Sequence, residues 1–235
     1  MQQEKAYLVT GASSGIGYET ALALALEEQN KVIAVSRNAG KLQQLREASG
    51  NKIETHLFDL DGGNFNELYT RLEQSGLKHL HGLVHNAGFL VNRSYADITR
   101  EELEQCYRVN VFAPFLLSQC LLPLLKAAGS AHIVHISSIG GVQGSVKFPG
   151  LSAYSSSKGA LAVLSECLAT ELAPEKIKVN CLALGAVQTE MLSMAFPGYE
   201  APLQAHDMGT FVSWFVVNGH RFFNGKILPV ALSTP

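Results

Sequence analysis

Hydrophobic and polar positions follow two alternating patterns along the chain. Short, nearly continuous apolar runs, typical of strands covered on both faces, are separated by longer stretches with helical spacing. The predicted strands are Ala6–Thr10, Lys31–Ser36, Lys52–Phe58, Leu80–His85, Ala131–Ser137, Lys176–Leu184 and Lys226–Val230. The predicted helices are Gly15–Glu28, Gly40–Ser49, Asn64–Ser75, Arg100–Ala128, Ser152–Leu172 and Leu203–Val217. This alternation predicts an α/β fold of the Rossmann type: one doubly wound parallel sheet of about seven strands, with helices on both faces.

The chain contains 235 residues and shows no internal repeat, low-complexity linker or shift in composition, so we expect one domain over residues 1–235. Hydrophobic residues make up 47% and charged residues 16%, which is enough apolar material for a sizeable core. The net charge is -2. Without a basic excess, we expect neither nucleic acid nor an anionic membrane as a partner.

No apolar run reaches the length of a membrane span, and the first residues lack a signal core. The longest candidate, around 111–125, is interrupted by Ser118, Gln119 and Pro123. We therefore expect a cytoplasmic protein. The four cysteines, Cys106, Cys120, Cys167 and Cys181, have no pairing or metal-ligand spacing, which favours buried, reduced thiols and no metal site.

A glycine-rich turn follows the first predicted strand and opens the first helix. It reads Gly11-Ala-Ser13-Ser14-Gly15-Ile16-Gly17. Glycines allow a phosphate to approach the backbone closely, and the free N–H groups and positive dipole end of a helix N-terminus attract it. The spacing differs from the common G-x-G-x-x-G fingerprint, and a structural turn would also explain a single motif of this kind. Its position after a strand favours a pyrophosphate site.

The end of the second strand indicates which dinucleotide binds. NAD enzymes usually place an acid there to hold the ribose hydroxyls, whereas this chain has Arg37. A guanidinium can bind a 2′-phosphate through paired, charge-assisted bonds. Arg37 could also be a solvated surface side chain, but its position favours binding of NADP(H). The remaining candidate contacts with adenosine are Asp59 and Leu60 after the third strand, and Asn86, Ala87 and Gly88 after the fourth.

Tyr154 and Lys158 are four residues apart and therefore share one face of a predicted helix. A free tyrosine has a pKa near 10, and a neighbouring ammonium lowers that pKa. We therefore expect Lys158 to tune Tyr154 toward proton exchange with a carbonyl or alcohol. Taken alone, an ordinary amphipathic helix explains the pair equally well. Ser138 lies at the end of the fifth strand, where its hydroxyl can bond the substrate oxygen, and Asn110 could hold a water that links Lys158 to solvent.

These motifs resemble, in their order along the chain, the short-chain dehydrogenase/reductase family. The resemblance rests on Thr10–Gly17, Asn86-Ala87-Gly88, Asn110, Ser138 and Tyr154-x-x-x-Lys158, and covers residues from about 6 to 190. It implies a catalytic set of Asn110, Ser138, Tyr154 and Lys158, no metal, and a further role of Lys158 in holding the nicotinamide ribose. It also implies that the turn with Gly185, Val187 and Thr189 contacts the nicotinamide end of the cofactor. By the same resemblance, the two long helices 100–128 and 152–172 would form the interface of a homodimer or homotetramer.

The chain departs from the family pattern at several places. Leu184 stands where many relatives have proline, the segment between Ser138 and Tyr154 is long, and the segment after Thr189 is short. The short segment predicts an open pocket or a small lid, contributed by Met191, Leu192, Met194 and Phe196. A substrate pocket of Phe89, Leu90, Val91, Phe148 and Leu192 would favour an apolar or aromatic carbonyl.

Three functions fit these observations. The first is an NADP(H)-dependent oxidoreductase that transfers a hydride between nicotinamide and a carbonyl or alcohol carbon of a small substrate. The second is a non-catalytic NADP(H)-binding sensor or scaffold, which would need the glycine loop but not Tyr154. The third is an epimerase or dehydratase acting on nucleotide-linked sugars. The third would need more substrate-binding residues after Thr189 than this chain has.

Overall fold

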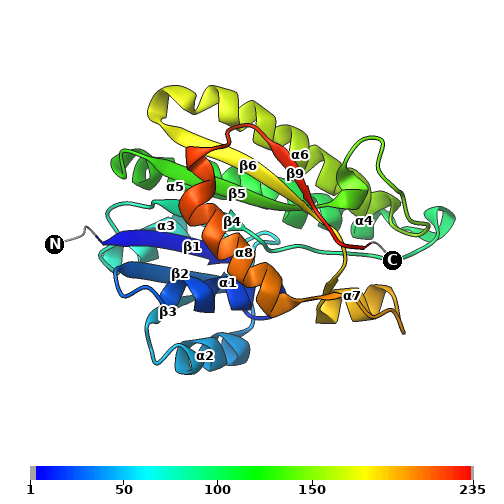
Figure 1. Cartoon of the computed structure of the whole chain (residues 1–235), viewed down its shortest axis with the longest axis horizontal. Helices are drawn as coiled ribbons and strands as arrows, with labels where there is room; N and C mark the ends of the chain where they lie inside the picture. Colours follow the sequence, from blue (N-terminus) through cyan, green and yellow to red (C-terminus); the bar gives the residue numbers. More distant parts are fainter. Residues whose placement is uncertain (1–3, 234–235) are drawn as a thin grey trace.

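Seven parallel strands form one sheet, and their order reverses in the middle. The computed structural model describes residues 4–233. The strands are β1 (Lys5–Thr10), β2 (Asn30–Ser36), β3 (Ile53–Leu57), β4 (Gly82–His85), β5 (Ala131–Ser138), β6 (Ile177–Leu184) and β9 (Ile227–Val230). The order is β3-β2-β1-β4-β5-β6-β9 (Figure 1). Because the chain first proceeds outward from β1 and then returns to β4, a crevice opens at the carboxyl ends of these two strands. The predicted fold class is confirmed.

Helices cover both faces of this sheet. They are α1 (Gly15–Ala25), α2 (Ala39–Ala48), α3 (Phe65–Gln74), α4 (Arg100–Tyr107), α5 (Ala113–Ala127), α6 (Ser152–Glu171), α7 (Glu190–Ala195) and α8 (Ala205–Asn218). Short 3-10 helices span Tyr95–Asp97, Ile139–Gly141, Ala173–Glu175 and Gly219–Arg221. Alternate residues of a strand point to opposite faces, so both faces of β1 need apolar side chains. This requirement explains the continuous apolar runs in the sequence.

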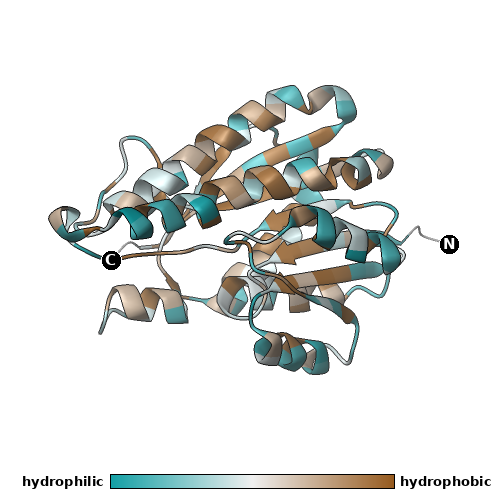
Figure 2. Cartoon of the chain, turned by 180° about the vertical axis from the view of Figure 1, so that it is seen from behind, coloured by the Kyte–Doolittle hydropathy of each residue, from teal (hydrophilic) through white to brown (hydrophobic). Residues whose placement is uncertain are grey.

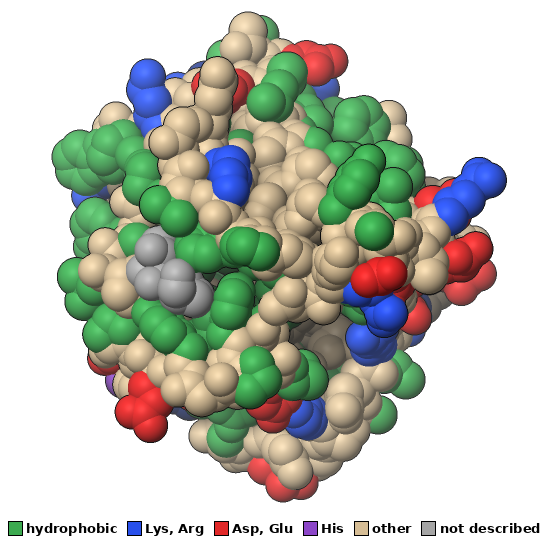
Figure 3. Space-filling view, turned by 90° about the vertical axis from the view of Figure 1, so that its right-hand side faces the viewer, with side chains coloured by type: hydrophobic (Ala, Val, Ile, Leu, Met, Phe, Trp, Pro, Cys, Tyr) green, Lys and Arg blue, Asp and Glu red, His purple; other side chains and the backbone are tan. Residues whose placement is uncertain are grey.

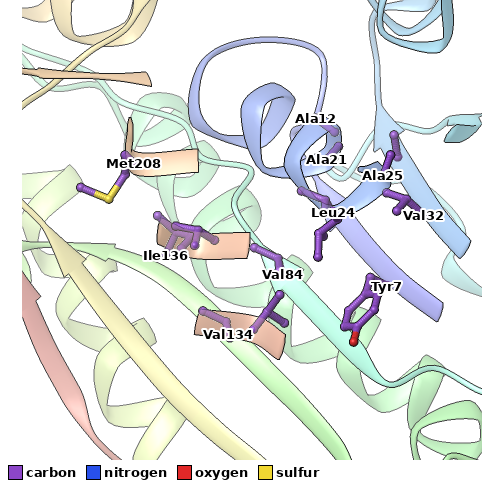
Figure 4. Close-up of a cluster of buried hydrophobic side chains, with 14 of the residues drawn as sticks. Tyr7, Ala12, Ala21, Leu24, Ala25, Val32, Val84, Val134, Ile136 and Met208 are labelled. Atoms are coloured by element: carbon purple, nitrogen blue, oxygen red, sulfur yellow. The ribbon is translucent and has the colours of Figure 1, made fainter. Parts of the chain in front are cut away.

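The two faces of the sheet support two separate cores. Tyr7, Leu24 of α1 and Met208 of α8 belong to one buried cluster on one face (Figure 4). Its neighbour Leu8 packs with Leu72 of α3 on the other. Burying each of these large side chains removes it from water and stabilises the fold by roughly 2 kcal/mol. Both cores fix β1 in place, and the glycine loop that follows β1 therefore lies at the crevice.

The long helix that we predicted at 100–128 runs over Arg100–Ala127 and contains a π-helical turn. Residues Arg108–Phe112 form a π-helical turn between α4 and α5, with an Ala113 N–H bond to the carbonyl oxygen of Arg108. A π turn accommodates one extra residue and is common at functional sites. By length and composition alone, the stretch Arg100–Ala127 is apolar enough to cross a membrane. However, Leu117 and Leu121 of α5 are fully buried in the second core, as in the core helix of a globular domain.

The segment after β6 also differs from the prediction. Leu203–Gln204 form a two-residue strand, β8, paired with β7 (Val187–Gln188), so α8 begins only at Ala205. Before β8, the chain forms α7, a helix of six residues that the apolar pattern did not indicate. The pairing of β7 with β8 closes the segment that carries α7 into a compact flap over the crevice.

All four cysteines are free thiols, but not all of them are buried. Cys106 and Cys181 lie in the interior, whereas Cys120 is half-buried and Cys167 is exposed on α6. The prediction of four buried thiols was therefore wrong for Cys167, because its position on α6 faces away from the sheet.

Candidate active site

The predicted site residues meet at the carboxyl ends of the strands. A cavity of about 410 Å³ opens there, on the hollowed face that Figure 3 shows. All of the predicted catalytic and cofactor-binding residues except Gly17 and Asn110 line it: Gly11, Ser13, Ser14, Gly15, Ile16, Arg37, Asp59, Leu60, Asn86, Ala87, Gly88, Ser138, Tyr154, Lys158, Gly185, Val187 and Thr189. Cavities of this size accommodate small organic ligands and cofactors. Gly17 and Asn110 lie directly behind its wall and position residues that do line it.

The N-terminus of α1 is open toward the cavity. Ser14, the residue before the helix, is extended and its side chain makes no capping hydrogen bond. The first N–H groups of α1 thus have no side-chain acceptor at Ser14, and the helix dipole adds a partial positive charge. Ser13 is held by a 2.7 Å bond between its hydroxyl and that of Ser36 at the end of β2. This geometry is suited to a phosphate group.

The glycines of the loop are required by close packing against β4. The Asn86 side-chain amide donates to the carbonyl oxygens of Thr10 at 3.1 Å and Gly11 at 3.2 Å. A Cβ atom on Gly17 would lie 2.3 Å from that amide nitrogen, and one on Gly11 would lie 2.7 Å from Ala87 Cα. Gly11 also has a φ of 65°, which favours glycine. Asn86 therefore fixes the loop, and the loop forms a cradle that fits a pyrophosphate.

Polar side chains surround the end of the cavity beside β2 and β3. Arg37 is exposed, and within residues 4–233 it forms no ion pair. Asp59 accepts the Asp61 N–H at 3.0 Å through its carboxylate. A guanidinium without a protein partner at this position is available to an anionic ligand.

One ion pair crosses the cavity, and the sequence did not indicate it. Lys41 of α2 contacts both carboxylate oxygens of Glu190 in α7, at 2.9 and 2.8 Å. Both residues line the cavity. Because they are 149 positions apart in the sequence, only the folded chain reveals the pair.

Tyr154 and Lys158 lie on one face of α6, as predicted. The Lys158 ammonium lies 5.8 Å from the centroid of the Tyr154 ring and donates to the carbonyl oxygen of Ile136 at 2.8 Å. Lys158 is only 2% exposed. Ser138, at the end of β5, accepts a bond from the Gly140 N–H at 3.2 Å. These three side chains converge where a small substrate could bind.

Burial dominates the pKa of both groups. It raises the pKa of Tyr154 to about 12, although a hydrogen bond with Ser138 acts in the opposite direction. It also lowers the pKa of Lys158 from 10.5 to about 8. We expected the ammonium to lower the pKa of the phenol, and in this geometry that expectation is wrong, because desolvation of the phenolate is the larger effect. Tyr154 is accordingly protonated at neutral pH.

The Asn110 side chain is buried and hydrogen-bonded to neighbouring segments of the chain. Its side chain exchanges two bonds with the backbone of Phe89, at 2.8 and 2.9 Å, and donates to the Ser157 hydroxyl at 2.9 Å. Asn110 is fully buried. These bonds give Asn110 a structural role that the sequence did not indicate. It fastens the segment after β4 to α6, beside Lys158.

The turn after β6 forms the other end of the cavity. The Thr189 hydroxyl caps α7 by accepting from the Leu192 N–H at 3.2 Å, and its methyl carbon would lie 3.2 Å from a Cβ on Gly15. Gly185 is packed against the C-terminal segment, because a Cβ there would lie 2.4 Å from the Cβ of Ala231. Thr189 thus faces the phosphate loop, while Gly185 permits close packing.

The region beside Tyr154 is apolar. Its lining includes Phe89, Leu90, Phe148, Leu151, Leu192 and Phe196. The rings of Phe148 and Phe196 meet edge to face, with centroids 6.1 Å apart, so the long loop before α6 touches the flap. Two expectations were wrong: Val91 packs in a small core with Cys106, and Met194 is 77% exposed.

Known proteins resemble this chain over most of its length. The profile of the short chain dehydrogenase family matches residues 5–200. Carbonyl reductase (NADPH) 2 of Sus scrofa is 36% identical over 78% of this chain and 72% of its own. The oxidoreductase YohF of Escherichia coli is 31% identical over 95% of this chain and 92% of its own. The chain therefore belongs to the short-chain dehydrogenase family and is an oxidoreductase.

Solved structures show the same fold over nearly the whole chain. A short chain dehydrogenase from Escherichia coli CFT073, complexed with NADPH, has a TM-score of 0.86 and 30% identity, and the match covers 97% of this chain and 96% of that one. A second one, from Shigella flexneri and complexed with NADP, has a TM-score of 0.85 and 29% identity, with 97% of each chain covered.

Proposed function

We propose that this protein is an NADP(H)-dependent carbonyl reductase, or the corresponding alcohol dehydrogenase, that acts on small apolar substrates. The observation that carries the proposal is the convergence of Tyr154, Lys158 and Ser138 in the cavity that also holds the glycine loop and Arg37. The relatives named carbonyl reductase (NADPH) 2 and the NADP-bound structures support the choice of cofactor. We further propose that residues 1–235 act as one domain.

The cofactor supplies the hydride when it is bound. The N-terminus of α1 and the glycine loop bind its pyrophosphate, and Arg37 binds its 2′-phosphate. Thr189 and Val187 contact its nicotinamide end, and Lys158 holds the adjoining ribose. Asp59, Leu60, Ala87 and Gly88 surround the adenosine portion. All of the residues named here line the cavity.

Tyr154 is the proton donor in the reductive direction. Its pKa of about 12 keeps the phenol protonated at neutral pH, so that it can donate to a carbonyl oxygen. The Ser138 hydroxyl stabilises the negative charge that develops on the same oxygen. The Lys158 ammonium then stabilises the phenolate that remains, and Asn110 keeps this region packed through its bonds to Phe89. In the oxidative direction, the same groups act in reverse.

The lining of the cavity beside Tyr154 defines the class of substrate. Phe148, Phe196, Leu192 and Leu90 offer apolar surface to a substrate. Of the charged residues in the lining, Arg37 and Asp59 belong to the end that we assign to the adenosine portion of the cofactor, and Lys41 and Glu190 are paired with each other. A charged substrate would lose its hydration here without a partner. We therefore propose an aromatic or other apolar ketone or aldehyde, and not a carboxylate or a phosphorylated sugar.

Lys158 argues against a purely structural or sensing role. A buried ammonium lowers the stability of the fold, and holding the nicotinamide ribose does not require Tyr154 and Ser138 beside it. A buried, charged residue that destabilises the fold, such as Lys158 beside Tyr154, is typical of a catalytic centre.

A cofactor titration tests the proposed function. We expect nicotinamide fluorescence to show tight binding of NADPH and weaker binding of NADH. Arg37→Asp is expected to weaken NADPH by about ten-fold or more and NADH far less, since it removes a charge-assisted bond to the 2′-phosphate. Arg46→Asp, which changes an exposed arginine in α2, is the control and should alter neither. Equal losses for both cofactors in the Arg37 variant would refute the 2′-phosphate role, and no binding of either would refute the function.

We also propose a homodimer or homotetramer built on the face of α5 and α6, and a cytoplasmic location in keeping with four free thiols. Phe112, Phe115 and Leu116 are exposed around the start of α5, and Val163 is exposed on α6 beside it (Figure 2). Apolar side chains gathered on neighbouring helices favour burial against a second copy. Light scattering should show Phe115→Glu as a smaller species than wild type. Met194→Glu, at an exposed methionine elsewhere, should leave the mass unchanged; if Phe115→Glu does so too, this interface is wrong.

A further inference from the structure

The ion pair between Lys41 and Glu190 joins two elements on opposite sides of the cavity. Lys41 lies in the first turn of α2, and Glu190 is the first residue of α7. The ammonium contacts both carboxylate oxygens, at 2.9 and 2.8 Å, and the two side chains keep 37% and 67% of their surface exposed. The pair is thus well aligned but open to water. Ion pairs of this kind contribute little stability and are readily exchanged.

The position of the pair relative to the phosphate loop is fixed at both ends. Lys41 is held near Arg37 because its backbone N–H is bonded to the side chain of Asn38, the residue before α2. Glu190 directly follows Thr189, whose methyl carbon lies against Gly15 of the phosphate loop. The pair therefore crosses the cavity between the end proposed for the 2′-phosphate and the flap.

Lys41 and Arg37 are the basic side chains that line this end of the cavity, among the residues described. A phosphate monoester carries a charge of about −1.5 to −2 at neutral pH, and it offers three acceptor oxygens. Such a group beside Arg37 competes with Glu190, which carries a single charge, for the ammonium of Lys41. Because the lysine side chain is long and flexible, it can turn from one anion to the other without a backbone change.

We propose that Lys41 is a second ligand for the 2′-phosphate of NADP(H) and that Glu190 competes for it. In this arrangement Glu190 sets the strength of NADP(H) binding: the carboxylate holds the lysine in the free protein and must release it to the phosphate. The inference rests on the proposed NADP(H) dependence, and it assigns a specificity role to two residues that the catalytic steps do not use.

Two small probes isolate the 2′-phosphate from the remainder of the cofactor. Adenosine 2′,5′-bisphosphate carries that phosphate, and 5′-AMP lacks it. Isothermal calorimetry should show that Glu190→Gln binds the bisphosphate roughly three-fold more tightly, because one exposed ion pair no longer competes. Lys41→Met should bind it roughly ten-fold more weakly, because one charge-assisted contact is lost. Neither variant should change the affinity for 5′-AMP.

A double variant and a matched control complete the experiment. Lys41→Met with Glu190→Gln should behave as Lys41→Met alone, because Glu190 acts through the lysine. Glu175→Gln breaks a similar exposed pair with Lys126, 2.6 Å in length and remote from the cavity, and should change no affinity. Thermal melting of each variant checks that the fold is intact.

The possible outcomes distinguish a failure of this inference from a failure of the proposed function. If wild type prefers the bisphosphate but Glu190→Gln leaves its affinity unchanged or weaker, the competition is refuted while NADP(H) dependence stands. If Lys41→Met weakens both probes equally, Lys41 does not bind the 2′-phosphate. If wild type binds the two probes with equal affinity, the preference for NADP(H) and this inference fail together.

Discussion

At the scale of single residues, Lys158 is the side chain whose position conflicts most with stability. Its ammonium is buried beside Tyr154, with the carbonyl oxygen of Ile136 as its hydrogen-bond acceptor. The shift of its pKa from 10.5 to about 8 corresponds to a destabilisation on the order of 3 kcal/mol at neutral pH. The residue that carries this cost is also the one that we propose to assist proton transfer by Tyr154.

Lys158→Met is therefore expected to be more stable than wild type at pH 7 and inactive. The gain in the free energy of unfolding should be about 1 to 3 kcal/mol, because the Ile136 carbonyl oxygen also loses its donor. Below pH 8 the lysine is charged in both states, and wild type bears the whole penalty. Between pH 8 and 10.5 the unfolded chain binds more protons, so wild type becomes more stable and the gain disappears. Urea unfolding at pH 7 and pH 10.5 measures both values; a loss of stability at pH 7 would contradict this account.

Residue types and spacing were sufficient to locate Tyr154 and Lys158 on one helix face, because four residues make about one turn. The direction of the Tyr154 pKa shift could not be obtained in this way, since burial depends on neighbours that are distant in the sequence. The same reason explains Asn110. Its bonding to the backbone of Phe89 requires the segment after β4 to lie against the π turn.

At the scale of elements, the turn between β1 and α1 depends on how closely β4 approaches it. A Cβ on Gly17 would lie 2.3 Å from the Asn86 amide nitrogen and 2.5 Å from the carbonyl oxygen of Gly11. The backbone of the turn would have to shift to relieve such contacts. The geometry of the phosphate cradle thus depends on the absence of one methyl group.

Gly17→Ala is expected to reduce NADPH affinity by about ten-fold or more and to lower the melting temperature, because the displaced loop no longer presents its N–H groups together. Gly40→Ala is the matched control. It lies in α2, and its nearest neighbour would be the Asn38 oxygen at 3.7 Å, so it should bind NADPH normally and melt slightly higher. Fluorescence titration and thermal melting give both quantities; normal affinity in Gly17→Ala would show that the cradle tolerates the methyl group.

The elements themselves were largely predictable, because strands buried on both faces and amphipathic helices leave strong patterns. Two were not. The π turn at Arg108–Phe112 leaves the apolar spacing of the long helix almost unchanged, and the six residues of α7 are too few to establish a period. β7 and β8 contain two residues each, and their pairing depends on the placement of the whole flap.

At the scale of the whole molecule, the strand order brings the residues of the candidate site together at the carboxyl ends of the strands. The loops after β1, β2, β3, β4, β5 and β6 converge there, and the flap with α7 closes over them (Figure 1). The alternating pattern indicated this convergence. It did not indicate contacts between distant loops, such as the pair of Lys41 and Glu190 or the rings of Phe148 and Phe196. These contacts shape the cavity and arise only from the complete fold.

The most direct test of Tyr154 as the proton donor is a single-turnover measurement. It compares hydride transfer from NADPH to an aromatic ketone in wild type and in Tyr154→Phe. We predict that the variant binds NADPH with a Kd within about two-fold of wild type, because the phenol oxygen makes no contact on which the phosphate sites depend. We also predict a rate at least about 100-fold lower, the size of the contribution expected from a positioned proton donor. A Tyr154→Phe protein that binds NADPH and reduces the ketone at nearly the wild-type rate would show that Tyr154 is not the proton donor.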